Sequence, residues 1–342
     1  MAYTTIKKPS DYFNTKLYTG NASTQSITGV GFQPDMCWFK VRNNTDTHAI
    51  FDSVRGVQQR IIPNDTSAEG TQSNGITSFD SDGFTSGGAN ITNGSGRNYA
   101  SWNWLASNTT ASNTDGSITS TVSANTTSGF SIVSYTGTGS VATVGHGLGS
   151  VPKMIIIKKR NSATGSDWFV YHVSNGNDSK IWLNQTSAKG TDTHMNNTTP
   201  TSSVFSIGAR TEVNNSGDTY IAYCFAEVKG FSKFGSYVGN GNADGTFIYT
   251  GFKPAFVMIK NSSSAGAWYM QDNKRDIDNP IALSLNASDS NADNNQGNIM
   301  DFLSNGIKIR NTGTGYNTSG GTYIYMAFAE EPLVGDNPAT AR

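Results

Sequence analysis

The chain carries one pattern of residues three times, and this repetition restricts its fold more than any other sequence feature. Each copy begins with Tyr-Xaa-Gly, passes through a Gly-apolar pair and a proline, and enters an apolar strand that ends in lysine. The prolines are Pro34, Pro152 and Pro254, and the lysines are Lys40, Lys158 and Lys260. Each copy closes with an aromatic-rich alternating strand that begins at Tyr99, Tyr220 or Tyr323. The repeat unit of about 100 residues is long enough to bury a core of its own.

The middle part of each copy contains a second short apolar strand, at 48–52, 168–172 and 268–272. Each copy then returns to isoleucine, at Ile61, Ile181 and Ile281. The first two copies share Asn-Xaa-Thr-Ser-Ala-Xaa-Gly directly afterwards, at 64–70 and 184–190, whereas the third reads Asn286-Ala-Ser. We therefore expect the third copy to depart from the other two at this point.

The local pattern predicts an all-β fold. Short runs rich in Val, Ile, Phe, Tyr and Trp are separated by turn dipeptides such as Asp82-Gly83, and helical periodicity is nearly absent. We predict three tandem antiparallel β-sandwich units of jelly-roll or lectin-like type. The expected divisions are an N-terminal tether 1–10, repeats 11–106, 129–229 and 230–330, a Ser/Thr/Asn-rich linker 107–128, and an extended tail 331–342. Within the linker, Ile118–Val122 alternates and can instead form the first strand of the middle unit.

Charge and hydropathy exclude two classes of partner. The net charge is −1 and only 14% of residues are charged, against about 25% in a typical domain. Because nucleic-acid binding and polybasic membrane binding both need dense Lys/Arg clusters, we expect neither. No apolar run approaches the length of a membrane span, and the start lacks the apolar core of a secretory signal, so we expect synthesis in a cytoplasm. Cys37 and Cys224 are predicted to be buried free thiols.

The residue types that carry chemistry do not form a recognisable constellation. The four histidines lack metal-ligand spacing, and the acidic loop 289–297 lacks the glycine and the bidentate glutamate of a calcium loop. Asp52 and Asp272 recur but become His172 in the middle copy, and an arginine follows each after three residues, as in an ion pair that braces a turn. We therefore predict no enzymatic activity, no metal and no cofactor.

Most of the repeated residues are interpreted as structural. The stems of Lys40, Lys158 and Lys260 are expected to cover the edge of the core while their ammonium groups reach water. Trp168 and Trp268 are candidates for stacking on a sugar ring, with a place in the core as the alternative. The remaining repeated residues are interpreted as a structural signature: Pro34, Pro152, Pro254, Asp52, Asp272, Tyr99, Tyr220 and Tyr323.

Several strings of the sequence resemble a known group of proteins. The segment 31–43 followed by Phe51-Asp-Ser-Val-Arg-Gly56 is one of these, and Gly145-His-Gly-Leu-Gly149, 239–245 and the final Pro-Ala-Thr-Ala-Arg342 are others. Together they resemble an uncharacterised repeat-domain family of tailed-phage virion proteins, especially of marine phages, found among tail, fibre and capsid-appendage proteins. The resemblance spans the whole chain and brings no catalytic residues with it.

The resemblance implies a phage virion structural protein that is made in the host cytoplasm and ends in the virion. Because no coiled-coil heptads are present, we expect an exposed accessory component of the capsid or tail rather than a complete fibre. Its expected partners are other virion proteins, and it is expected to be a homo-oligomer or to occur in multiple copies. A carbohydrate-binding tail-fibre module that recognises a host-surface glycan is the alternative, and a polysaccharide depolymerase is the third possibility.

Overall fold

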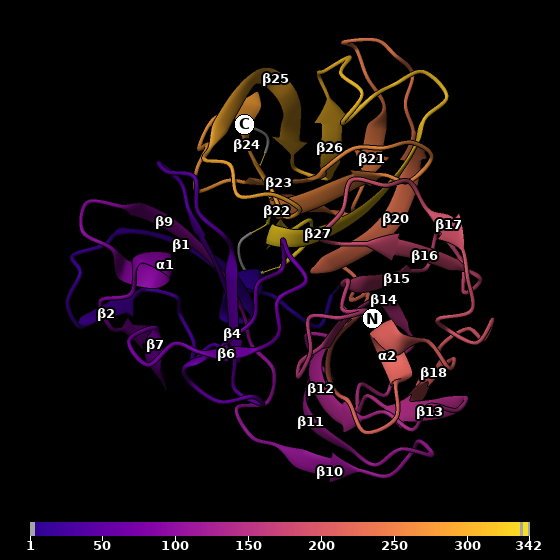
Figure 1. Cartoon of the computed structure of the whole chain (residues 1–342). Coiled ribbons are helices and arrows are strands. Elements are labelled where there is room, and N and C mark those ends of the chain that lie inside the picture. Colours follow the sequence, from indigo (N-terminus) through magenta and orange to yellow (C-terminus); the bar gives the residue numbers. More distant parts are fainter. Residues whose placement is uncertain (1–3, 336–337, 341–342) are drawn as a thin grey trace.

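The structure, a computed structural model that describes residues 4–335 and 338–340, is built almost entirely from antiparallel strands, with 44% strand and 3% helix. This confirms the predicted all-β class. Figure 1 shows that the three sequence repeats form three lobes around a common centre, with repeat 1 in indigo and purple, repeat 2 in magenta, and repeat 3 in orange and yellow.

Repeat 1 places its opening, closing and central strands in one four-stranded sheet. In sheet order these strands are β1 (Phe13–Thr19), β9 (Asn98–Trp104), β3 (Met36–Val41) and β4 (Ala49–Asp52). A second sheet contains β2 (Gln25–Thr28), β8 (Gly83–Ser86) and β7 (Ile76–Asp80). The remaining elements are the 3-10 helix η1 (Pro9–Asp11), the hairpin of β5 (Gln59–Arg60) and β6 (Gly70–Thr71), and the one-turn helix α1 (Asn90–Asn93).

Repeat 2 repeats this order within a larger sheet. The eight strands are β10 (Ala111–Asn113), β11 (Ser120–Asn125), β12 (Phe130–Thr136), β19 (Thr219–Ala226), β14 (Pro152–Lys159), β15 (Phe169–His172), β16 (Ser179–Trp182) and β17 (Gly190–Thr191). A second sheet pairs β13 (Ala142–Gly145) with β18 (Val204–Ile207), and the one-turn helix is α2 (Thr211–Asn214).

Repeat 3 joins both of its sheets into one continuous set of strands. In order these are β20 (Ser232–Val238), β27 (Thr322–Pro332), β22 (Phe252–Asn261), β23 (Trp268–Asp272), β24 (Ile281–Asn286), β25 (Asn294–Leu303), β26 (Gly306–Ile309) and β21 (Phe247–Tyr249). The order β20-β27-β22-β23 matches β1-β9-β3-β4 and β12-β19-β14-β15. The three repeats therefore share one topology.

The central strand of each large sheet is buried on both faces. In β3, Met36 and Trp38 point into a central cluster, whereas Cys37 and Phe39 point into a cluster that belongs to repeat 1. The strands β14 and β22 divide their residues between the central cluster and their own cluster in the same way. Two buried faces require consecutive apolar residues, which explains why these strands read as continuous apolar runs.

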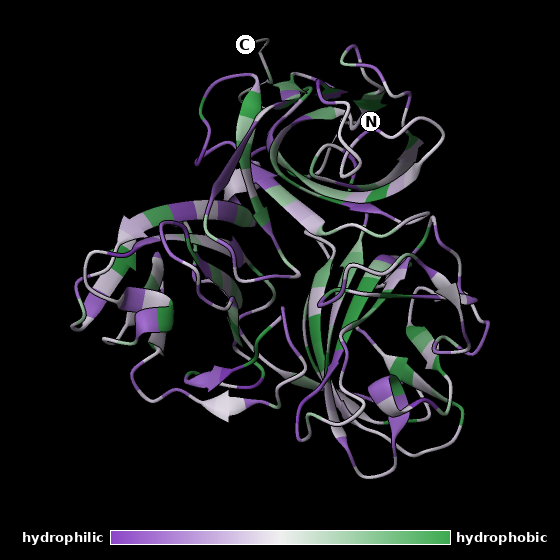
Figure 2. Cartoon of the chain, turned by 45° about the horizontal axis from the view of Figure 1, so that its top comes forward, coloured by the Kyte–Doolittle hydropathy of each residue, from purple (hydrophilic) through white to green (hydrophobic). Residues whose placement is uncertain are grey.

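The central cluster is made jointly by all three repeats. Figure 2 shows hydrophobic residues along the strands that face the middle of the molecule. Phe328 of repeat 3 packs there against Phe13 and Trp104 of repeat 1 and against Phe225 of repeat 2, with ring centroids 4.9, 5.7 and 6.0 Å away. Each repeat thus has a core of its own, as the unit length suggested, but a second core exists only when the three are assembled.

The expected tether, linker and tail each contribute residues to the folded body. Ile6, in the expected tether, is buried in the central cluster, and residues 1–3 lie outside the described residues. Strands β10 and β11 fall inside the expected linker, and β11, which pairs with β12, overlaps the end of the alternating stretch Ile118–Val122. The expected tail begins inside β27, which continues to Pro332.

The third repeat aligns differently from its sequence match. Leu285 pairs with Met270 as Ile181 pairs with Val170, so Leu285 and not Ile281 takes the place of the repeated isoleucine. Ile281 lies instead in the core of repeat 3. The turn after β23 is longer than in the other two repeats, so the residues that follow it are offset in the alignment. For this reason Asn286 does not correspond to Asn64 and Asn184.

The shared core predicts that the whole chain unfolds in one cooperative transition. Phe328→Ala should lower the free energy of unfolding by about 3–5 kcal/mol while keeping a single transition, because the cavity opens where all three repeats meet. Calorimetry with urea unfolding measures both quantities. Val141→Ala, at a side chain 60% exposed, is the matched control and should stay within about 0.5 kcal/mol of the parent. Separate transitions, of which only one moves, would contradict a shared core.

Candidate functional site

The polar contacts that hold the repeats together follow a threefold pattern. We use the name docking loops for residues 62–70, 182–190 and 286–294, each of which contacts the next repeat. The backbone N–H of Glu69 donates to Arg160 O at 2.7 Å, that of Lys189 to Ser262 O at 3.0 Å, and that of Asp293 to Arg42 O at 2.7 Å. Repeat 1 thus bonds to 2, 2 to 3, and 3 back to 1, which closes the chain into a ring.

An aromatic side chain from the following repeat bonds to the start of each docking loop. Trp168 Nε1 donates to Ile62 O at 2.9 Å and Trp268 Nε1 donates to Trp182 O at 2.8 Å. At the third junction His48 takes this place, with Nε2 2.9 Å from Asn286 O.

The hydrogen bonds around His48 define its tautomer. Trp38 Nε1 donates to His48 Nδ1 at 2.9 Å, so the proton of the neutral ring is on Nε2 and is donated to Asn286 O. Burial lowers the pKa of His48 well below its usual 6.5, which keeps the ring neutral at neutral pH.

The two tryptophans do not offer the surface that sugar stacking requires. Trp168 is 0% exposed and Trp268 is 1% exposed, and both lie in the central cluster. Their rings pack in the core and their N–H groups bond across a repeat junction, as buried tryptophans usually require. The core position that was the alternative interpretation matches the structure.

The three repeated lysines are completely buried, which contradicts the expectation that their ammonium groups reach water. Lys158 Nζ donates to Thr66 O of the docking loop at 3.0 Å and to Ser166 O at 2.6 Å. Lys260 Nζ similarly donates to Thr186 O of the next docking loop at 2.9 Å. Backbone carbonyls accept these hydrogen bonds and so satisfy the buried ammonium groups.

Lys40 completes the lysine pattern with a different set of partners. Its Nζ donates to Val41 O at 2.7 Å and to Asn44 O at 3.4 Å within repeat 1, and it faces the charges of Asp289 and Asp293 from the third docking loop. Burial lowers the pKa of each repeated lysine from 10.5 to about 8. All three junctions therefore contain a lysine whose pKa is lower than that of a lysine in water.

Buried ion networks reinforce two of the junctions. Arg55 and Asp52 form a fully buried pair at 2.5 Å, and Arg55 also reaches Glu69 at 3.1 Å. Glu69 then pairs with Arg160 of repeat 2 at 2.9 Å. Burial opposes ionisation of Glu69, but the two guanidinium groups outweigh it and lower its pKa. The predicted turn-bracing pair is confirmed, and it extends into a contact between repeats.

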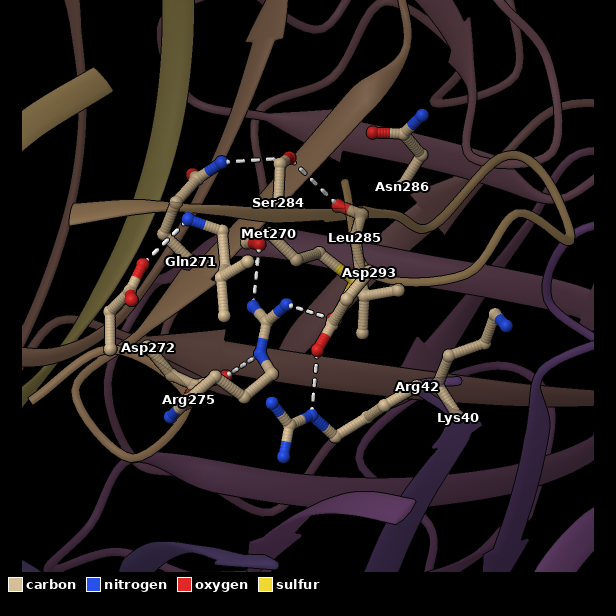
Figure 3. Close-up of polar contacts among 12 residues, drawn as sticks. Lys40, Arg42, Met270, Gln271, Asp272, Arg275, Ser284, Leu285, Asn286 and Asp293 are labelled. Carbon is tan, nitrogen blue, oxygen red and sulfur yellow. Dashed lines mark hydrogen bonds and ion pairs between the residues drawn. The ribbon is translucent and has the colours of Figure 1, made fainter. Parts of the chain in front are cut away.

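Figure 3 shows the equivalent network between repeats 3 and 1, with Arg275 and Arg42 both reaching Asp293. Arg275 pairs with Asp272 at 2.6 Å and with Asp293 at 2.9 Å, and Arg42 pairs with Asp293 at 2.7 Å. Each aspartate at the start of its network also accepts from the neighbouring repeat. Trp102 Nε1 donates to Asp272 Oδ2 at 3.1 Å, and the Tyr223 hydroxyl donates to Asp52 Oδ2 at 2.7 Å.

The junction between repeats 2 and 3 has lost the whole network rather than one member of it. His172 stands at the aspartate position and Asn175 at the arginine position, while Lys189 replaces the acid of the docking loop. His172 Nε2 instead lies 3.1 Å from Tyr325 O of repeat 3, and burial lowers its pKa to about 4. A lone buried charge would be costly, so loss of one partner explains the loss of all.

The remaining signature residues brace individual repeats. The closing tyrosines stack on the opening tyrosines, with centroid distances of 5.0 Å for Tyr99 on Tyr18, 5.2 Å for Tyr220 on Tyr135 and 4.9 Å for Tyr323 on Tyr237. Their hydroxyls hold the segment before the closing strand, for example through Tyr99 and Asn90 O at 2.6 Å. The prolines Pro34, Pro152 and Pro254 are buried at the start of the central strands, and the latter two lie at register shifts.

Sequence reasoning missed one exposed feature, the aromatic pair Phe247 and Tyr249 on the edge strand β21, which are 43% and 54% exposed. Strand register aligns 247–249 with 26–28 and 143–145. The first two copies carry small residues at the outward positions where the third carries rings.

Within residues 4–335 and 338–340, His, Cys, Asp and Glu side chains do not gather in threes in a way that could hold a metal ion. No helix among these same residues has the length and hydropathy to cross a membrane. Cys37 and Cys224 are buried and free, as predicted.

Fold and junctions define an all-β protein in which three repeats close into a ring around a shared core. The chain belongs to the family described as a domain of unknown function (DUF7483), whose model matches residues 8–332. That single match extends over all three repeats, in agreement with a ring that forms one structural unit. No curated protein matches the chain.

The buried lysines predict a specific pH dependence of stability. Between pH 8 and 10.5 the unfolded chain retains lysine protons that the folded chain has released, so the free energy of unfolding should rise with pH. Tyrosines with raised pKa values oppose this rise near pH 10, so the useful window is about pH 8 to 9.5. Urea unfolding across that window gives the slope of the free energy of unfolding against pH. In Lys158→Met this slope should be smaller than in the parent, by at most about 1.4 kcal/mol per pH unit.

Lys158→Met should also destabilise the protein at pH 8, by about 1–3 kcal/mol, because the buried carbonyl of Ser166 loses its donor. The control is Lys233→Met, whose ammonium forms a partly exposed pair with Glu227 and should matter little. If Lys158→Met changes neither the free energy of unfolding nor its dependence on pH, Lys158 does not contribute to the stability of the junction.

Proposed function

We propose that the protein is a tailed-phage virion structural protein, an exposed accessory component of the capsid or tail that docks on other virion proteins. We also propose that each repeat is a β-sandwich unit, so that three sandwiches stand in tandem in one chain. The observation that carries the structural role is the closed ring, in which one chain unites three repeats around a shared core.

The use of buried charge supports a structural rather than a catalytic role. Asp52, Arg55 and Glu69 are satisfied by one another across a junction, and the repeated lysines are satisfied by carbonyl groups. Groups committed to such contacts stabilise an assembly of repeats, whereas catalytic groups face a cleft where a substrate can reach them. The phage setting itself rests on the resemblance of the sequence strings to virion proteins.

The surface composition supports a place on a particle. With a net charge of −1 and 14% charged residues, neighbouring copies repel one another weakly even at high local density. We propose that the protein occurs in multiple copies per virion.

A second candidate function is a carbohydrate-binding module that recognises a host-surface glycan. One observation favours it: Phe247 and Tyr249 stand exposed side by side on β21. Aromatic rings of this kind are the usual platform for the apolar faces of sugars.

The leading proposal predicts that the protein remains attached to purified particles. Antibody labelling, together with reconstructions of particles with and without the protein, should show density that fits a three-lobed ring on the capsid or on the tail. A protein present in infected cells yet missing from purified particles would refute the proposal.

A further inference from the structure

One outer sheet face of repeat 3 differs in chemistry from the same face of the other two repeats. Phe247 pairs with Lys308, and Lys308 pairs with Asp301 on the next strand. Tyr249 pairs with Gly306 in the adjacent row. Directly paired residues point to the same side of a sheet, so these side chains share one face of the strands β21, β26 and β25.

The rings are not required by the fold, as the other repeats demonstrate. The buried residues Ile248, Ile27 and Val144 hold the same position of this strand in the three repeats, so their neighbours can be compared. The position of Phe247 is occupied by Ser26 in repeat 1 and by Thr143 in repeat 2. The position of Tyr249 is likewise occupied by a small residue in both.

The cationic side of this face is also confined to repeat 3. Lys308 corresponds to Thr85 in repeat 1 and to Ser206 in repeat 2. Two residues further along the strand, Arg310 corresponds to glycine in both other repeats. Since the ring of three repeats closes with hydroxyls and glycine at these positions in two repeats, its closure does not require the aromatic and charged residues of the third.

The geometry of the two rings suits a sugar chain. Gly306 lies beneath Phe247, since a Cβ placed on this glycine would come within 2.9 Å of the Phe247 ring. The outer part of the ring thus lies over Gly306, and 43% of the side chain stays exposed to solvent. Residues two apart on a strand are about 7 Å apart, so successive sugar rings of one chain can lie over Phe247 and Tyr249.

The charged groups beside the rings balance one another. Lys308 pairs with Asp244 at 2.8 Å, and Arg310 pairs with Asp301 at 2.6 Å. Paired cations and carboxylates supply hydrogen-bond donors and acceptors next to each other, as vicinal hydroxyl groups need, without a net charge that would select a charged ligand.

We propose that the outer face of β21, β26 and β25 in repeat 3 is a binding site for a neutral oligosaccharide. Phe247 and Tyr249 stack on the sugar rings, and Lys308, Asp244 and Arg310 bond to the hydroxyls. This inference rests on the carbohydrate-binding function proposed above as the second candidate, and it assigns that function to one face of one repeat.

The test replaces the two rings by the residues that repeat 1 carries at the same positions. Phe247→Ser combined with Tyr249→Thr should weaken binding to immobilised neutral gluco-, galacto- or manno-oligosaccharides by about tenfold or more, measured by calorimetry or biolayer interferometry. Both side chains are exposed, so thermal unfolding should not change. Ser26→Ala with Thr28→Ala, on the same face of repeat 1, is the matched control and should bind like the parent.

The outcomes separate the site from the function. If the parent protein binds none of the neutral oligosaccharides, or binds only uronic-acid oligosaccharides, the proposed ligand is wrong. If the parent binds them and the Phe247/Tyr249 double variant binds equally well, carbohydrate binding stands but this site is refuted. If sedimentation shows that the parent self-associates and the double variant is monomeric, the face is a contact between copies and the proposal is overturned.

Discussion

The double burial of the central strands is the constraint on which the rest of the structure depends. Each of the strands β3, β14 and β22 covers its own repeat with one face and the common centre with the other. A single repeat would leave the second apolar face in water, and contiguous exposed apolar surface of this kind drives association. Closure of three repeats into a ring removes that face from solvent, so the junctions exist because the sheets require them.

The junctions then determine which residues must be polar inside the molecule. Each docking loop points backbone carbonyls at the next repeat, and that repeat provides donors for them. Lys158, Lys260 and the N–H groups of Trp168 and Trp268 supply them. The ion networks are complete at two junctions and replaced at the third. A partial network would bury an uncompensated charge, so all of its members are present or none.

Much of the local structure could be predicted from the residues alone. The all-β class, the free thiols and the ion pair between Asp52 and Arg55 follow from alternation, burial tendency and spacing. The positions of the lysine ammonium groups could not be predicted in this way. An apolar strand that ends in lysine has the same sequence pattern whether its end lies in water or against another repeat. The exposed pair on β21 was missed because strand register, and not sequence similarity, aligns Phe247 with Ser26.

The sequence by itself determined the repeat, the strand pattern and the residues that brace each unit, since these depend on contacts within one copy. Only the tertiary structure decided that the copies share a core, that the repeated lysines are buried and that, among the described residues, large exposed aromatic rings lie in repeat 3. Those properties depend on which strand faces meet across the ring, and a local pattern records that a face is apolar without recording what covers it.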